Sequence, residues 1–160
     1  MTRTVEEVVA LWEAVVRSGG AVGFPADVPG REIETAAAAL HEGTVQGTEH
    51  MLVERGAGGL RGLVVLRPAQ GNLFEHRAAV TKLMVEPSCQ GAGIGSRLLE
   101  RVVDSARQRG FLQLRLSTRG GGPLPEFYSR RGWTQVGVFP RALQVAPGVF
   151  CDEHWFHLNL

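Results

Sequence analysis

The sequence predicts one α/β domain, in which helices flank a mixed sheet of parallel and antiparallel strands. The chain has 160 residues, which suits a single domain over 1–160 and is short for two. Hydrophobic residues make up 44% of the chain and charged residues 21%, as in ordinary globular proteins. Segments with helical periodicity are interspersed with short apolar segments of strand character, which is typical of a sheet with mixed strand directions.

The first half of the chain predicts two helices and then a hairpin. Apolar residues near the N-terminus recur at helical spacing, and Thr4-x-x-Glu7 resembles a capping box. A second helix is expected over EIETAAAALHEGT, where Gly43 is expected to end it. HMLVER (50–55) and LRGLVVLRP (60–68) are predicted to be the paired strands of the hairpin, joined by a glycine-containing turn.

The second half alternates strands with helices. One strand is predicted over RAAVTKLMVEP, ended by Pro87, and another over FLQLRLST (111–118), with the leucines at 112, 114 and 116 on one face. Between them the spacing predicts a helix that begins near Gly93. Its apolar face comprises Ile94, Leu98, Leu99, Val102, Val103 and Ala106. A short helix over PEFYSRRG and strands over WTQVGVFP and FCDEHWFHLNL complete the order α-α-β-β-β-α-β-α-β-β.

A glycine-rich segment, PSCQGAGIGS (87–96), joins a predicted strand to this helix. Glycine costs conformational entropy and adds no packing, so its clustering at a helix N-terminus indicates the close approach of a ligand. Backbone N–H groups converge there and the helix dipole adds partial positive charge, which favours a phosphate. No lysine follows Gly95, as a P-loop would require. The spacing Gly91-x-Gly93-x-Gly95, late in the chain, also differs from a dinucleotide-binding fingerprint.

The spacing Gln90-x-x-Gly93-x-Gly95, between the strand LMV and a helix, resembles motif A of the GNAT superfamily of N-acetyltransferases. Further along the chain, EFYSRRGW (126–133) resembles the second signature of that family, in the same order and at a similar separation. The resemblance implies the GNAT fold, a mixed central sheet with flanking helices. The first edge strand of that fold is expected to be missing or short, because this chain opens almost at its first helix.

Three stretches resemble one branch of the family, the tabtoxin-resistance type of acetyltransferase. They are GGAVGF (19–24), HRAAVTKLMVEPS (76–88) and FYSRRGWTQVGVFP (127–140). That type acetylates the amine of a small, amino-acid-like toxin with a β-lactam ring, so the resemblance implies a small-molecule amine as acceptor, although acceptors change easily on one fold. Members of the family commonly dimerise, and a homodimer is an expectation of the same kind.

The resemblance also implies that acetyl-CoA binds as a co-substrate. The backbone of Leu83, Met84 and Val85 is expected to pair with the pantetheine arm, much like an added strand. The pyrophosphate is expected to lie against the following segment, which comprises Gln90, Gly91, Ala92, Gly93, Ile94, Gly95 and Ser96. Tyr128, the only tyrosine, falls where the family places its general acid. The alternative interpretation of Tyr128 is a packing role, with a hydroxyl that points to solvent.

The group that deprotonates the acceptor amine is less evident. Many family members carry a carboxylate where this chain has Ala79, and the tabtoxin-resistance type tends to carry an acid where this chain has Ser117-Thr118. The step is then left to a water chain, to bulk solvent, or to Glu75 or His76 at the strand entrance. His76 is the preferred side chain because histidine titrates near neutrality, and its alternative is a polar residue at a strand end. His76, Ser117 and Thr118 are therefore the candidate acceptor-site residues.

Composition disfavours other classes of function. A net charge of +1 gives no reason to expect a nucleic-acid partner. No window is apolar enough for a membrane span, the N-terminus carries acidic residues that a signal peptide lacks, and two distant cysteines make no disulfide framework, so a cytoplasmic protein is expected. Cys151-x-x-His154-x-x-His157 is not expected to bind a metal, because strand geometry puts the two histidines on opposite faces.

These observations predict an enzyme that transfers the acetyl group of acetyl-CoA to a primary amine of a small molecule. The amine is expected to attack directly within a ternary complex, with Tyr128 protonating the departing thiolate. Two alternatives stay open. A non-catalytic acyl-CoA-binding regulatory module is favoured by the missing carboxylates and disfavoured by the tyrosine. A protein or peptide N-acetyltransferase would be favoured by an open, acidic groove.

Overall fold

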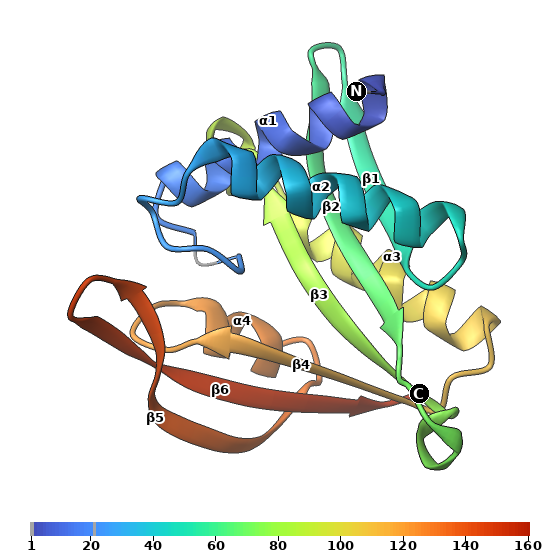
Figure 1. Cartoon of the computed structure of the whole chain (residues 1–160). Helices are drawn as coiled ribbons and strands as arrows, with labels where there is room; N and C mark the ends of the chain where they lie inside the picture. The colour runs from blue at the N-terminus through green and yellow to red at the C-terminus, as the bar shows by residue number, and fades with distance from the viewer. Residues whose placement is uncertain (1, 21) are drawn as a thin grey trace.

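The computed structural model describes residues 2–20 and 22–160 (Figure 1). In this part of the chain, six strands form one sheet in the order β1-β2-β3-β4-β6-β5, and four α-helices flank it. The elements are α1 (Arg3–Arg17), α2 (Gly30–Val45), β1 (His50–Gly56), β2 (Gly59–Pro68), β3 (Arg77–Val85), α3 (Ile94–Gln108), β4 (Gln113–Arg119), α4 (Leu124–Ser129), β5 (Thr134–Ala146) and β6 (Val149–Asn159). The predicted α/β class and the order of helices and strands are confirmed. No strand precedes α1 within the described residues, and Ala21, in the stretch GGAVGF, lies outside them.

Two of the predicted helix ends are wrong. The side chain of Thr2 accepts a hydrogen bond from the Val5 N–H at 3.4 Å, so Thr2 is the N-cap of α1 and the expected box at Thr4 does not form. Gly43 lies inside α2, because its backbone keeps the right-handed helical conformation. The left-handed glycine that follows this helix is Gly47, with φ 75°.

Helices α1 and α2 lie on one face of the sheet (Figure 1). Their apolar faces share one buried cluster with β2 and β3, so the two helices are fixed against the first half of the sheet. The cluster comprises Val5, Val8, Leu11, Trp12, Val15, Val16, Ile33, Ala37, Leu40, Leu60, Leu63, Val65 and Met84. No helix in the described part of the chain is long and apolar enough to cross a membrane.

Helix α3 covers the opposite face of the sheet. All residues of its predicted apolar face are buried. Gly62 of β2 permits the close approach, because a Cβ there would lie 2.8 Å from the Met84 carbonyl oxygen and 2.9 Å from Leu98 Cδ1. Leu112 departs from the prediction, since it precedes β4 and 62% of its surface is exposed, while the other two leucines of that predicted face are buried.

Strands β3 and β4 are parallel neighbours only at their first residues. Arg77–Ala79 pair with Gln113–Arg115, and beyond these residues the two strands diverge (Figure 1). β3 stays paired with β2, whereas β4 stays paired with β6. The gap between residues 80–85 of β3 and 116–119 of β4 is called the wedge below. A β-bulge at Lys82, with φ 53°, interrupts the pairing of β3 with β2 along the wedge.

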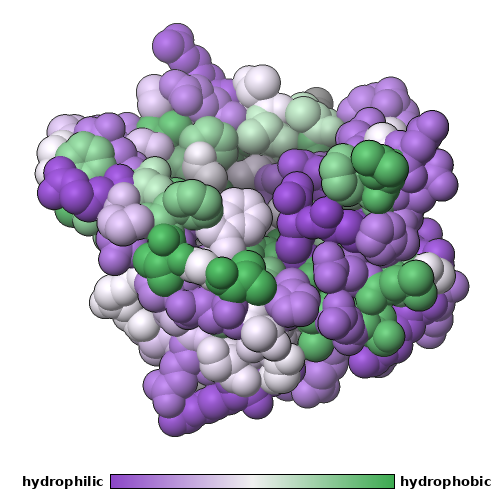
Figure 2. Space-filling model, turned by 90° about the horizontal axis from the view of Figure 1, so that it is seen from below, coloured by the Kyte–Doolittle hydropathy of each residue, from purple (hydrophilic) through white to green (hydrophobic). Residues whose placement is uncertain are grey.

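Strands β5 and β6 form a long antiparallel ribbon at the outer edge of the sheet. β5 continues to Ala146, well past the predicted strand, and register shifts interrupt its pairing with β6. The ribbon exposes apolar residues such as Val136 and Phe139. Figure 2, seen from the side of this ribbon, shows apolar residues as separate groups among hydrophilic ones. Within the described ribbon, β6 is the strand that pairs with β4, so the ribbon supports the second side of the wedge.

Candidate functional site

The glycine-rich segment forms an uncapped helix N-terminus beyond the end of β3. Gly91 and Gly93 have φ values of 81° and 78°, which glycine adopts without strain. Gly93 is the N-cap of α3, and no side chain caps this helix. The Arg97 N–H donates to the Gly93 carbonyl at 3.1 Å, so the N–H groups of residues 93–96 have no partner within the helix. These N–H groups and the helix dipole suit an anion.

Arg131 brings a positive charge to this helix N-terminus. Its guanidinium donates to the Ser96 hydroxyl and, at 2.9 Å, to the Phe127 carbonyl, and it stacks 3.8 Å from the centroid of the Phe127 ring. Arg97, by contrast, is paired with Glu54 at 3.0 Å. Sequence reasoning gave Arg131 no role, although it is part of the EFYSRRGW signature, because only the folded chain brings α4 beside α3.

The last residues of β3 border the wedge with a free backbone edge. Met84 and Val85 pair with β2 on their other edge. The side chains of Leu83 and Val85 pack toward α3, and that of Met84 is buried beneath α1 and α2. The Gln90 carboxamide donates to the Val85 carbonyl at 3.3 Å, which ties the glycine-rich segment to the strand end. The backbone of these residues, rather than their side chains, is thus available to a ligand.

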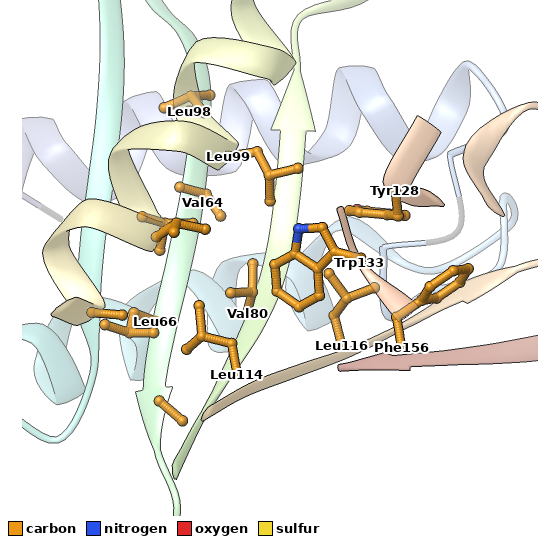
Figure 3. Packing of buried hydrophobic residues seen from close by; sticks show 14 of the residues in the cluster. Val64, Leu66, Val80, Leu98, Leu99, Leu114, Leu116, Tyr128, Trp133 and Phe156 are labelled. Atoms are coloured by element: carbon orange, nitrogen blue, oxygen red, sulfur yellow. The ribbon is translucent and has the colours of Figure 1, made fainter. Parts of the chain in front are cut away.

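Tyr128 of α4 lies in an apolar cluster beside the wedge. Figure 3 shows Trp133 in the gap between β3 and β4, with Tyr128 on the side of α4. The Tyr128 ring lies 5.1 Å from that of Phe127 and 5.8 Å from that of Phe156, between centroids. No described residue is hydrogen-bonded to its hydroxyl, and that oxygen is not fully enclosed. Burial raises the pKa of Tyr128 to about 12, so the hydroxyl stays protonated at neutral pH and can donate.

The structure separates the three candidate acceptor-site residues. His76 lies outside the wedge, because the paired residues 77–79 come between, and its side chain is exposed. Its carbonyl accepts hydrogen bonds from the Leu112 and Gln113 N–H groups instead. Ser117 and Thr118 border the wedge on opposite faces of β4, since strand geometry alternates side chains. Ser117 is on the face toward α1 and α2. His76 therefore does not share the wedge with these two residues.

Lys82 is a charged residue that sequence reasoning did not place in the site. It lies at the β-bulge, and its Nζ is 5.6 Å from the centroid of the Trp12 ring. Burial, together with the charge of Arg67, lowers the pKa of Lys82, and Glu49 opposes this effect. Glu49 itself is paired with Arg67. The available signal was compositional, because this is the one lysine among 17 basic residues.

The histidine and cysteine residues near the C-terminus do not converge. In the described residues, no group of three or more His, Cys, Asp and Glu side chains could hold a metal ion. His154 pairs opposite Thr118, and His157 opposite Arg115, so the two histidines lie on opposite faces of β6. Cys151 is a free cysteine. The candidate site thus consists of backbone N–H groups, a buried phenol and the Arg131 guanidinium.

Comparison with known proteins defines the class. A family model described as the acetyltransferase (GNAT) family matches residues 24–133. The chain therefore belongs to the GNAT acetyltransferase family, and it is an acetyl-CoA-dependent N-acetyltransferase. The expected fold family, the enzyme class and acetyl-CoA as co-substrate are confirmed. Enzymes of this family bind an acceptor substrate as well.

Solved structures of the same fold cover nearly the whole chain. The ribosomal-protein-alanine N-acetyltransferase of Brucella melitensis is 19% identical, with a TM-score of 0.81, over 98% of this chain and 94% of that one. A GCN5-related N-acetyltransferase of Kribbella flavida is 18% identical, with a TM-score of 0.80, over 100% and 94% of the two chains. The YncA protein of Salmonella typhimurium, solved with its cofactor acetyl-CoA, is 19% identical, with a TM-score of 0.78, over 98% and 88%. At these identities the likeness concerns the fold.

Proposed function

We propose that this enzyme acetylates a primary amine of a small molecule, by direct attack of the amine on acetyl-CoA within a ternary complex. The strongest support for acetyl transfer is the Tyr128 hydroxyl. It lies beside the wedge, and no described residue is hydrogen-bonded to it. The stretches 76–88 and 127–140, which resemble the tabtoxin-resistance type, supply β3, the end of α4 and part of β5. Their resemblance to that type is the ground for proposing an amino-acid-like acceptor.

Residues at the end of β3 and the start of α3 fit acetyl-CoA. The free N–H groups of residues 93–96 can donate to its pyrophosphate, and Arg131 adds a positive charge beside them. The free edge of β3 over residues 83–85 can pair with the amides of the pantetheine arm. When bound, acetyl-CoA supplies an activated thioester. In this proposal residues 1–160 act as one catalytic domain.

Tyr128 is suited to assist the departing sulfur. During transfer, the amine nitrogen bonds to the acetyl carbon, the carbon–sulfur bond breaks, and the proton lost by nitrogen is matched by one gained at sulfur. A thiol has a pKa of ~8.5, below that of Tyr128, so the hydroxyl stabilises the departing thiolate by donating a hydrogen bond to it. The sulfur then gains its proton from solvent, which replaces the full proton transfer from Tyr128 that the sequence led us to expect. The apolar surroundings strengthen that hydrogen bond, because little water competes for it.

Deprotonation of the acceptor amine is left to solvent. Ala79 of β3 and Ser117 of β4 offer no carboxylate at the wedge, and His76 lies outside it. A free amine must then come from solution before it attacks. We therefore expect the rate to rise with pH toward the pKa of the acceptor, without a bell-shaped maximum at neutral pH.

The test is thiol release from acetyl-CoA, measured for the wild type and for Tyr128→Phe. The variant removes only the hydroxyl, so we expect kcat to fall by roughly 10²-fold or more. Stability should not fall, because no described residue bonds that hydroxyl. Equal kcat for the two proteins would contradict the role of Tyr128.

The acceptor panel separates the alternatives. It contains small amines, amino acids, amine antibiotics and a peptide with an N-terminal alanine. Turnover of the peptide alone would replace the proposal with a protein N-acetyltransferase, the activity that the Brucella protein is named for. Binding of acetyl-CoA without thiol release from any acceptor would support a regulatory acyl-CoA-binding module.

A further inference from the structure

We propose that the acceptor amine carries an anionic group, and that Arg77, Arg115 and Trp155 bind this group on the sheet face toward α1 and α2. The inference rests on the proposed function and names the chemical class of its acceptor. Carboxylate is the form that we expect, with phosphonate as the alternative source of the same negative charge. The three residues come from β3, β4 and β6, and the strand register places them together.

A pocket of about 520 Å³ opens beside these residues. Its polar lining includes Arg77, Arg115 and His157, and its apolar lining includes Trp155, Phe139 and Val136. Among the described residues, no aspartate or glutamate lines it. The pocket therefore lacks the acidic character that would favour the positively charged terminus of a peptide chain, and it combines cationic groups with aromatic walls.

Two hydrogen-bond donors in this pocket are enclosed and unpartnered. The Arg77 Nε and the Trp155 Nε1 are shielded from solvent and make no hydrogen bond within the described residues. Thr81 Oγ1 is also buried and makes no hydrogen bond to a described residue. Its strand position puts it on the same sheet face as Arg77. A buried donor without a partner costs about 1–3 kcal/mol, so such groups are normally satisfied. A bound carboxylate would supply the oxygens that these donors lack.

The guanidinium groups of the pocket are also without carboxylate partners. Among the described residues, Arg77 and Arg115 form no ion pair, whereas Arg67 of β2 pairs with Glu49, which lies just before β1. Arg115 lies over the Trp155 ring instead, with its Cζ 5.8 Å from the centroid. The Arg115 guanidinium donates no hydrogen bond to a described residue, so its N–H groups can bind an anion.

Nearby charges do not neutralise this pocket. Arg77 lies over the Phe74 ring, with its Cζ 5.3 Å from the centroid. Glu153 is on the same face of β6 as Trp155, but it pairs opposite Arg119 and does not line the pocket. The local balance of charge therefore favours a negative ligand.

The position of the pocket suits an amine that attacks the thioester. Pairing of β3 with β4 ends at Ala79 and Arg115, where the wedge begins. A pantetheine arm that runs along β3 from the glycine-rich segment points toward this same end. An acceptor held by its anionic group at Arg77 and Arg115 would then present its amine to the wedge.

The experiment compares acceptors that differ in one charge. Thiol release from acetyl-CoA is measured with glycine, β-alanine, 4-aminobutyrate and L-phenylalanine, each against its amide, and with aminomethylphosphonate. We expect kcat/KM for the best acid to exceed that of its amide by about tenfold or more, as a charged hydrogen bond implies. Comparing kcat/KM for aminomethylphosphonate with that for glycine shows whether the pocket prefers a phosphonate or a carboxylate.

Variants then assign the effect to the pocket. Arg115→Gln, at an exposed position, and Arg77→Gln should remove most of the preference for the acid. Trp155→Phe keeps an aromatic ring but loses the enclosed N–H donor, and it should lower the preference for the acid over its amide several-fold. Arg107→Gln, on α3 away from the pocket, is the matched control and should leave it unchanged. Thermal stabilisation by the best acid, without acetyl-CoA, gives a second readout that Arg115→Gln should abolish.

The outcomes separate this inference from the proposed function. Equal turnover of acids and amides would overturn the anion site and leave the acetyl transfer standing. A preference for acids that survives in both arginine variants would also overturn it. If no amine releases thiol, the proposed function fails, and the thermal measurement alone then tests the anion site. Stabilisation of the wild type but not of Arg115→Gln supports the anion site, and its absence overturns the site.

Discussion

Gly95 gives a direct test of the helix N-terminus, because stability and binding should change in opposite directions. Its φ is not in the left-handed region, so the backbone does not require glycine there. A Cβ at Gly95 would lie 3.6 Å from Val85 Cγ2 and 3.9 Å from Phe127 Cζ, both ordinary contacts. It would therefore project between the end of β3 and α4, where we propose that the pyrophosphate approaches.

The expected magnitudes follow from this geometry. Alanine is better than glycine in a helix by about 0.5–1 kcal/mol, so Gly95→Ala should raise the Tm by about 1–4 °C. The added methyl group keeps a phosphate from the Gly95 N–H. Loss of one charge-assisted hydrogen bond is worth about 1.5–3 kcal/mol, so the Kd for CoA should rise roughly 10- to 150-fold.

The assay is isothermal titration with CoA, together with thermal unfolding. Gly110→Ala is the control at the other end of α3, where φ is 82° and a Cβ would meet no atom within 4 Å. Its left-handed strain should lower stability by about 1–2 kcal/mol while the Kd for CoA stays the same. A Gly95→Ala protein that is more stable and binds CoA as the wild type does would refute the reasoning.

Two further predictions concern the buried tyrosine and the packing of α3. Tyr128 is the only tyrosine, so the near-ultraviolet absorbance of tyrosinate reports it alone, and its midpoint should lie near pH 12 because burial raises the pKa to about 12. The unfolded chain ionises this group at lower pH, so the free energy of unfolding should fall between about pH 10 and 12. The Tyr128→Phe variant should lose less stability over this range. A tyrosinate midpoint near pH 10 would contradict the burial. Gly62→Ala should destabilise by about 1–3 kcal/mol in urea unfolding, because its Cβ would lie 2.8 Å from the Met84 carbonyl oxygen, and an unchanged midpoint would show that α3 can shift freely.

Local patterns in the sequence predicted local structure well. The apolar face of α3 was predicted completely, because its 3.6-residue period is a property of one segment. The glycines before α3 predicted a helix that begins near Gly93, and Gly93 is its N-cap in the structure. The cap of α1 was wrong, because the Thr4-x-x-Glu7 pattern favoured Thr4, whereas the helix begins at Arg3 and Thr2 is its N-cap.

Residues that meet across strands were not predictable in this way. His76 was a reasonable base from its place before the strand, yet the pairing of residues 77–79 with β4 leaves it outside the wedge. Arg131 reaches Ser96 only because α4 folds back beside α3. Neither contact leaves a periodic signal in the chain.

The sequence by itself determined the order of the elements, the glycine-rich start of α3 and the place of Tyr128 in its signature. Only the tertiary structure decided that β3 and β4 diverge after Ala79, and that Arg77, Arg115 and Trp155 share one pocket. The physical reason is that helix faces and turns depend on neighbouring residues, whereas a shared sheet face depends on the register between strands. That register is set by the packing of the whole chain.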